Sequence, residues 1–333
     1  MIKILTGLLI ILLSWRDILR ATPFCNRTRR RLGFPDLFHG STWIAWSAVA
    51  RRMKHGYWRE AFLRFYLPAT LLLFVCTMVL MLKLGFALLR TGITAEGDDP
   101  PGTLTLSMLA LSILQSFVQY GFCIVVAAYL LALYKEHRRR KAKMAEIVAR
   151  LGHPQSTVNL LLGGWQAYGS KRVIENLRGL ERWSAELLVS NRAYPILCRA
   201  CVLSPSQPWL SVQTAIMDAS AALIAATEDN ALAAQARHTV SMARRVVVEA
   251  AELLEVETPT PARERYLLGE LADLHRALAA TDISVREESL ADERLILYQD
   301  TYESYVLSLA AYLLMPLPSW ERVGDSITKM VRH

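Results

Sequence analysis

Two long apolar runs, separated by a short polar segment, constrain this chain more than any other feature of its sequence. The runs extend from residue 65 to 89 and from residue 104 to 134. Each is long enough to cross a lipid bilayer as a helix, which takes about 20 predominantly apolar residues. Fourteen residues connect them, from Arg90 to Thr103, and these include the polar turn from Glu96 to Gly102. The sequence therefore predicts a tight helical hairpin in a membrane over residues 65–134.

Charge and cysteine content indicate the same environment. The chain has 333 residues, 53% of them hydrophobic, and a formal net charge of +8. The basic residues cluster beside the apolar runs, where lipid headgroups and membrane topology account for them, so nucleic acid is not expected as a partner. The five cysteines form no disulfide framework, and Cys76 and Cys123 fall inside the predicted spans. We expect an integral membrane protein whose first partner is the lipid bilayer.

The first apolar stretch, from Ile2 to Leu19, leaves two interpretations open. It lacks the basic start and the small-residue cleavage site of a secretory signal, which favours a retained transmembrane helix over residues 1–20 that starts outside. Arg16 and Asp17 shorten its apolar core, so the alternative is a helix that lies flat at the membrane surface. The first interpretation adds a third crossing to the two of the hairpin.

Basic segments flank the hairpin on both sides. From residue 20 to 64, ten arginines and lysines stand against two acids, and a dense basic run follows Tyr134. By the positive-inside rule, the connector 21–64 and the juxtamembrane linker 135–160 are expected in the cytoplasm. Aromatic residues interleaved with the bases favour a short helix at the level of the lipid headgroups. These aromatic residues are Trp43, Trp46, Tyr57 and Trp58.

The third span carries a stripe of polar side chains. Offsets of three and four residues place its members along one side of a helix. Glutamine amides near the middle of a bilayer need a partner, either another helix or water. Two interpretations follow, hydrogen bonding within a helical bundle or the lining of a pore, and both turn the stripe away from lipid. The candidate pore-lining residues are Ser112, Gln115, Ser116, Gln119 and Cys123.

The remaining part of the chain, residues 161–333, is expected to be a cytosolic helical domain, which makes the fold class all-α. Apolar residues recur there at helical spacing, without strand-like alternation of useful length. Cys198 and Cys201 have C-x-x-C spacing, but they lack a thioredoxin-like context and are expected to be buried thiols. The histidines lack the spacing of a metal site, so no metal, cofactor or enzymatic activity is expected. The predicted helices cover residues 173–189, 210–226, 231–254, 262–280 and 287–314.

Several short motifs extend through both halves of the chain. The third span contains Tyr120-Gly121-Phe122 and ends at Tyr134 before the basic run. It resembles the inner helix of bacterial two-pore-domain potassium-channel-like proteins, and Gly85-Phe86 resembles the outer helix of that family. The resemblance covers nearly the whole chain and implies an oligomer in the bacterial inner membrane, with a cytoplasmic C-terminal domain and Gly121 as a candidate hinge. Further residues in the family's order are Trp183, Glu186, Ser190, Tyr194, Pro195, Arg199, Trp209, Leu210, Asp218, Tyr305, Leu314, Met315, Pro316, Leu317, Pro318 and Trp320.

One feature of that family is absent from this sequence. Potassium selectivity uses a re-entrant pore helix and a filter of backbone carbonyls. The descent takes about ten helical residues and the extended return about five more, so residues 90–103 are too few and too charged. If residues 117–122 were the filter, residues 123–134 would supply only about 18 Å of helix for the return. The sequence predicts a channel scaffold without a pore loop or selectivity filter.

Two functional hypotheses remain. In the first, the protein is an ion channel or channel relative: a homo-oligomer surrounds an axis lined by the stripe, conducts ions with poor selectivity, and uses the helical domain for gating or assembly. In the second, it is a non-conducting membrane anchor or regulatory subunit that has kept the channel scaffold, with a filter-bearing homologue as a partner. Neutral side chains replace an ion's hydration shell incompletely, which is why any conduction should be poorly selective.

Overall fold

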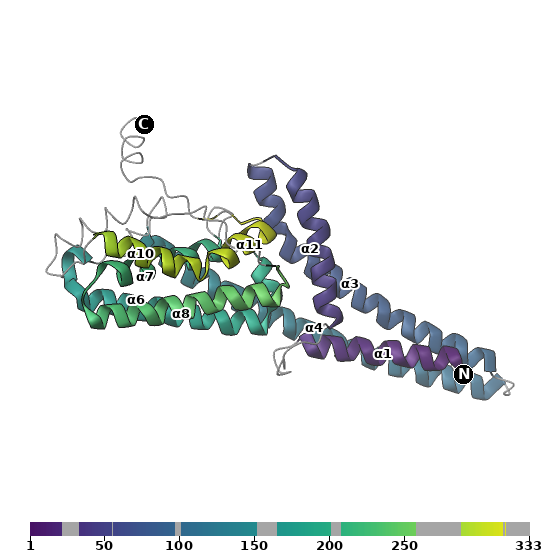
Figure 1. Cartoon of the computed structure of the whole chain (residues 1–333). Helices are drawn as coiled ribbons and strands as arrows, with labels where there is room; N and C mark the ends of the chain where they lie inside the picture. Colours follow the sequence, from purple (N-terminus) through teal and green to yellow (C-terminus); the bar gives the residue numbers. More distant parts are fainter. Residues whose placement is uncertain are drawn as a thin grey trace. The chain divides into compact units, whose positions relative to one another are not determined.

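A computed structural model describes residues 1–21, 33–54, 56–96, 101–151, 165–200, 208–257, 288–315 and 317. In these ranges the secondary structure is helical, as Figure 1 shows, and no β-strand element occurs there. The predicted all-α fold class is confirmed. The chain divides into two compact units, Met1–Glu136 and His137–His333.

The first unit contains the predicted hairpin. In the described part of the chain, three helices are long and apolar enough to cross a membrane: Tyr57–Thr94, Met108–Ile147 and Trp209–Ala226. The first two are the arms of the hairpin and indicate a membrane protein. The helices of this unit are α1 (Ile2–Ala21), α2 (Phe34–Arg52), α3 (Tyr57–Glu96) and α4 (Pro101–Leu151), whose residues up to Glu136 belong here.

Glycines bring α1 into close antiparallel contact with α3. A Cβ added at Gly7 would lie 2.7 Å from the carbonyl oxygen of Gly85, and one added at Gly92 would lie 2.6 Å from Ile4. The later residue of α3 thus meets the earlier residue of α1. Small residues allow this approach between helices in a membrane. The packing places α1 along a helix that is long enough to span, but α1 is not among the three candidate spans of the described residues, so its crossing stays a prediction.

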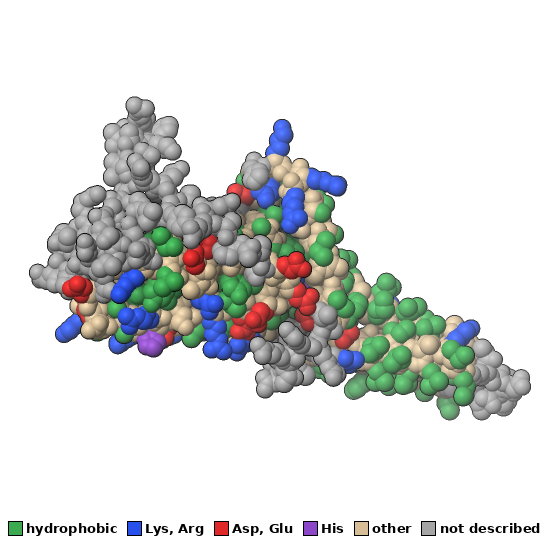
Figure 2. Space-filling view, viewed as in Figure 1, with side chains coloured by type: hydrophobic (Ala, Val, Ile, Leu, Met, Phe, Trp, Pro, Cys, Tyr) green, Lys and Arg blue, Asp and Glu red, His purple; other side chains and the backbone are tan. Residues whose placement is uncertain are grey.

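The outer surface of α1 is apolar. Leucines on the side away from α3 are exposed, and Figure 2 shows hydrophobic side chains covering this part of the molecule. An exposed apolar surface of this extent is what a bilayer would cover. The exposed leucines are Leu5, Leu8, Leu9 and Leu12.

Aromatic side chains join α2 to the first part of α3. The rings of Trp43 and Tyr66 meet edge to face with their centroids 4.8 Å apart, and Trp46 stacks on Phe62 at 4.2 Å. Trp43 is 1% exposed, so its ring is covered by protein. The reason is that α3 offers it an aromatic partner, which the sequence pattern alone does not reveal. The aromatic residues that stay exposed at the start of α3 are Tyr57 and Trp58.

The second unit is built around the apolar helix α7. Every residue of α7 is buried, because α6, α8, α10 and α11 pack against it. A helix that is apolar on all sides is buried in a core or in a membrane, and here protein covers it. Asp229 begins α8 by accepting hydrogen bonds from the amides of Ala231 and Leu232. The elements are the end of α4, α6 (Trp165–Ala193), η1 (Pro195–Arg199), α7 (Trp209–Ala226), α8 (Asn230–Leu253), α10 (Glu288–Asp300) and α11 (Glu303–Leu313).

The helices expected in this unit occur with one break. The predicted helix 287–314 is divided into α10 and α11 by a turn at Thr301 and Tyr302. The Thr301 hydroxyl donates to the carbonyl oxygen of Tyr298, which satisfies a backbone acceptor at the end of α10. The helix predicted over residues 262–280 lies outside the described residues.

Candidate functional site

The polar stripe of the third span lies at the edge of the buried face of α4. Phe122 and Val126 of α4 belong to the hydrophobic core of the first unit. Gln115 and Gln119 are half-buried beside that core, whereas Cys123 is exposed. The stripe thus begins in the bundle and turns outward along the helix.

Hydroxyl groups at the outer end of the stripe have partners within the chain. The Ser112 hydroxyl donates to the carbonyl oxygen of Met108 at 2.8 Å, and Ser116 donates to that of Ser112 at 2.9 Å. The Arg90 guanidinium, from α3, donates to the Ser112 hydroxyl at 3.1 Å. In the sequence, Arg90 is the first residue of the segment that connects the two apolar runs, and the sequence did not predict this contact with the stripe.

Two amide atoms of the stripe have no hydrogen-bond partner among the described residues. They are Oε1 of Gln115 and Nε2 of Gln119, and both are buried from solvent. A buried polar atom without a partner costs about 1–3 kcal/mol. These two amides are therefore the atoms in the hairpin that most require a further donor or acceptor.

Gly121, the candidate hinge, lies inside the continuous helix α4 and faces α1. A Cβ at this position would be 3.6 Å from the ring of Trp15, an ordinary contact distance. The ring of Trp15 also meets Phe122 edge to face, with centroids 6.0 Å apart. Successive helical residues turn by about 100°, so Gly121 and Cys123 flank Phe122 on opposite sides. Within the stripe, Cys123 is consequently on the side of α4 away from Gly121 and Trp15, whereas Gln115 lies within about 20° of Phe122.

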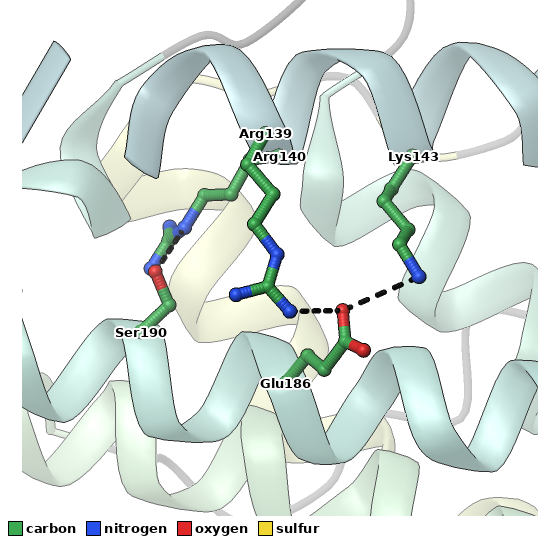
Figure 3. A network of polar contacts seen from close by, with 5 residues as sticks. All are labelled: Arg139, Arg140, Lys143, Glu186 and Ser190. Atoms are coloured by element: carbon green, nitrogen blue, oxygen red, sulfur yellow. Dashed lines mark hydrogen bonds and ion pairs between the residues drawn. The ribbon is translucent and has the colours of Figure 1, made fainter. Parts of the chain in front are cut away.

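A second polar site joins the basic run at the end of α4 to α6, inside the second unit. Figure 3 shows Arg139 and Lys143 pointing toward Glu186, with distances of 3.2 and 3.5 Å to its Oε2 atom. The three side chains are 58%, 43% and 30% exposed. Exposed ion pairs of this kind contribute about 0–1 kcal/mol each. Their main effect is to set which face of α4 meets α6.

Arg140 is the buried member of this network. Its Nε donates to the Ser190 hydroxyl at 2.6 Å, and its Nη2 donates to Oδ1 of Asn191 at 2.9 Å. The residue is 6% exposed. A buried guanidinium is tolerated only with such hydrogen bonds, because its desolvation is costly. Glu186 and Ser190, which carried part of the family resemblance, are thus the residues of α6 that bind side chains of the basic run.

Other residues of the resemblance hold the core of the second unit together. The indole Nε1 of Trp209 donates to the carbonyl oxygen of Cys198 at 3.0 Å, which ties α7 to η1. The Tyr302 hydroxyl donates to the buried carboxylate of Asp218 at 2.7 Å. These contacts give the residues structural roles within the helical domain.

The Cys198 thiol is fully buried in η1. Burial raises its pKa from the ordinary value of 9.0 to about 11, against the smaller opposing effects of Arg140 and Arg199. A thiol with this pKa remains protonated and unreactive at neutral pH. Cys198 is therefore a buried thiol, as predicted, while Cys201 lies outside the described residues.

No group of three or more histidines, cysteines, aspartates or glutamates that could hold a metal ion occurs among the residues that the structure describes. Comparisons with protein-family models, with curated proteins and with solved structures found no match. The helices and contacts above indicate an all-helical membrane protein with a hairpin.

Proposed function

We propose that the protein is a channel-like membrane protein whose hairpins assemble into an oligomer around the polar stripe of α4. In this proposal the protein is a divergent relative of the bacterial potassium-channel-like proteins that it resembles, it has no selectivity filter, and any ion conduction is poorly selective. It lies in the bacterial inner membrane, with its helical domain on the cytoplasmic side for assembly or regulation.

The orphaned amide atoms of Gln115 and Gln119 carry the proposal. Hydrocarbon offers no hydrogen bonds, so a polar atom that lacks a partner within one chain favours association with another chain or contact with water. The exposed Cys123 continues the stripe on the side away from Trp15. A second copy facing the exposed Ser116 and Cys123 would create a polar interior, and Gln115 and Gln119 would reach it by turning their side chains outward.

The alternative is a non-conducting anchor or regulatory subunit, which can assemble with a filter-bearing homologue. One observation favours it: Arg90 already covers the Ser112 hydroxyl at the outer end of the stripe. In that case the stripe would be satisfied by neighbouring helices and would admit no water.

Thiol modification distinguishes these two functions. A variant that keeps Cys123 as its only cysteine is reconstituted into proteoliposomes and treated with a charged, membrane-impermeant thiosulfonate. If Cys123 lines a water-filled path, the reagent reacts with it and reduces the ion flux. The matched control carries Ile124→Cys in a background that has Cys123→Ala, because Ile124 is also exposed on α4 but points about 100° away.

The two outcomes are distinct. Fast modification of Cys123 with slow modification at position 124, together with a measurable ion flux, supports the channel. Equal and slow modification at both positions, with no flux of potassium or chloride, contradicts conduction and leaves the anchor.

A further inference from the structure

Three exposed polar residues are spaced seven apart along α3. They are Cys76, Lys83 and Arg90, and all three are exposed. Residues seven apart on a helix lie within about 20° of one another, so the three form one column. Lys83 lies about 10 Å deeper in the span than Arg90, at a rise of 1.5 Å per residue.

This column lies beside the polar stripe of α4. The hydrogen bond from Arg90 to Ser112 fixes the register of the two helices, whose short connection makes them antiparallel. Seven residues before Arg90 is Lys83, and seven residues after Ser112 is Gln119. Equal steps in opposite chain directions place Lys83 and Gln119 at the same depth. Both helices therefore contribute polar groups to one surface of the hairpin. We call this surface the lane, and it consists of Lys83 and Arg90 on α3 and Gln119 on α4.

The lane is on the side of the hairpin away from α1. On α3, the close contacts with α1 are made by Gly85 and Gly92, not by the exposed Lys83 and Arg90. On α4, Gly121 faces Trp15, whereas Gln119 lies about 160° around the helix from Gly121. Lys83 and Arg90 are thus left exposed in a single copy of the first unit, whereas Nε2 of Gln119 is buried.

The span contains bases without acids. Residues 61–95 and 100–135 contain no aspartate or glutamate, although they include Lys83 and Arg90, and the acidic turn begins at Glu96, six residues beyond Arg90. The nearest acid in the described part of α1, Asp17, lies toward the opposite end of that helix from Ile4, which meets Gly92. Lysine and arginine in a span are costly in hydrocarbon and normally face water, a counter-ion or another polar group.

The polar hydrogens of the lane also match an anion. The ammonium of Lys83, the guanidinium of Arg90 and the amide Nε2 of Gln119 are all hydrogen-bond donors. Nε2 of Gln119 is buried and has no acceptor among the described residues. Pores that pass anions are lined by arginine and lysine, whereas rings of carboxylates select cations.

We infer that the lane formed by Lys83, Arg90 and Gln119 binds small inorganic anions such as chloride, and that it gives the proposed pore a preference for anions. This inference rests on the proposed function for conduction, but the anion site itself does not require a current. It also differs from what the family resemblance implies, since potassium channels pass cations.

The test uses the full-length protein in planar bilayers under a potassium chloride gradient. The sign of the reversal potential reports the ratio of chloride to potassium permeability. We expect this ratio to exceed one and to fall by about threefold or more in Lys83→Gln and in Arg90→Gln, since each removes a positive charge from the lane. Arg90→Lys should retain the preference, because it keeps the charge.

Lys3→Gln is the matched control. Lys3 is exposed and lies next to Ile4, which packs against Gly92, so it is at a similar depth to Arg90 but on α1. Its loss should leave the permeability ratio unchanged. A decrease equal to that of Arg90→Gln would mean that general surface charge, and not the lane, sets the preference, which would overturn the inference.

Chloride binding in detergent separates the two proposals. Broadening of the chloride nuclear magnetic resonance line should occur with the unmodified protein and should weaken in Lys83→Gln and Arg90→Gln. Line broadening without any current would support the anion site and contradict conduction. A current that prefers potassium, or line broadening that both variants leave unchanged, would overturn the anion site even if the channel is real.

Discussion

Arg140 shows how one residue in a run of similar residues acquires a distinct role. The basic run after Tyr134 is typical of a segment that faces lipid headgroups. The helical register nevertheless turns Arg140 inward, onto Ser190 and Asn191, while Arg139 remains exposed. The sequence pattern predicts the charge of the run but not which member is buried.

We expect Arg140→Met to lower the free energy of unfolding of the helical domain by about 2–4 kcal/mol. The change leaves the Ser190 hydroxyl and the Asn191 carbonyl oxygen without their donor. Thermal unfolding in detergent, followed by circular dichroism, measures the change in stability. Arg139→Met is the matched control and should change stability by less than about 1 kcal/mol, because its ion pair with Glu186 is exposed. Equal effects of the two substitutions would contradict the role assigned to Arg140.

Because the Cys198 thiol is buried, we expect the free energy of unfolding of the helical domain to fall at alkaline pH. Its thiol ionises near 9.0 when unfolded and near 11 when buried, so above pH 9 the unfolded state loses its proton first. The stabilisation is complete below that pH and is lost as the pH rises through about 11, by about 3 kcal/mol in total. Cys198→Ala should remove this part of the pH dependence, although it also lowers stability at every pH through the cavity it leaves. Urea unfolding at several pH values measures both effects. If the free energy of unfolding fell with pH by the same amount in the unmodified protein and in Cys198→Ala, the loss of stability could not be assigned to Cys198.

At the scale of elements, the contact between α1 and α3 depends on glycine. Gly7→Ala would place a methyl group 2.7 Å from the backbone oxygen of Gly85, so the helices must move apart. We expect a loss of stability of about 1–3 kcal/mol, measured by thermal unfolding in detergent. Gly40→Ala, inside α2, meets nothing within 4 Å and should instead stabilise by about 0.5–1 kcal/mol. If Gly7→Ala were as well tolerated as Gly40→Ala, the close contact would be wrong.

Helical periodicity predicted the elements well, and their partners poorly. The apolar pattern located α7 almost to the residue and gave the two arms of the hairpin, since burial and period are properties of a segment. The burial of Trp43 against Tyr66 requires α2 to fold back on α3, which no local pattern records. The contact of Arg90 with Ser112 depends in the same way on the register between two helices. The seven-residue spacing of Lys83 and Arg90 in the sequence does indicate that these two residues lie on the same side of α3.

At the scale of the whole molecule, the stripe of α4 should control association. We expect the double variant Gln115→Leu, Gln119→Leu to weaken the oligomer by about 1 kcal/mol for each amide removed, because buried amides stabilise contacts between helices in lipid. Mass photometry of the protein in lipid nanodiscs measures the distribution of oligomers. Ile113→Leu and Ile124→Leu, on the exposed apolar side of α4, form the control pair. An unchanged distribution in the glutamine variant would contradict assembly through the stripe.

The antiparallel packing of α1 on α3 determines which ends of the two helices lie on the same side of a membrane. Ile4 meets Gly92, so residues near the start of α1 and near the end of α3 emerge on the same side of the bilayer. A polar label attached at Lys3 and one attached at Thr94 should therefore become accessible together, from one side of the membrane and never one from each side. If α1 crosses the membrane beside α3, one accessible label determines the orientation of both helices.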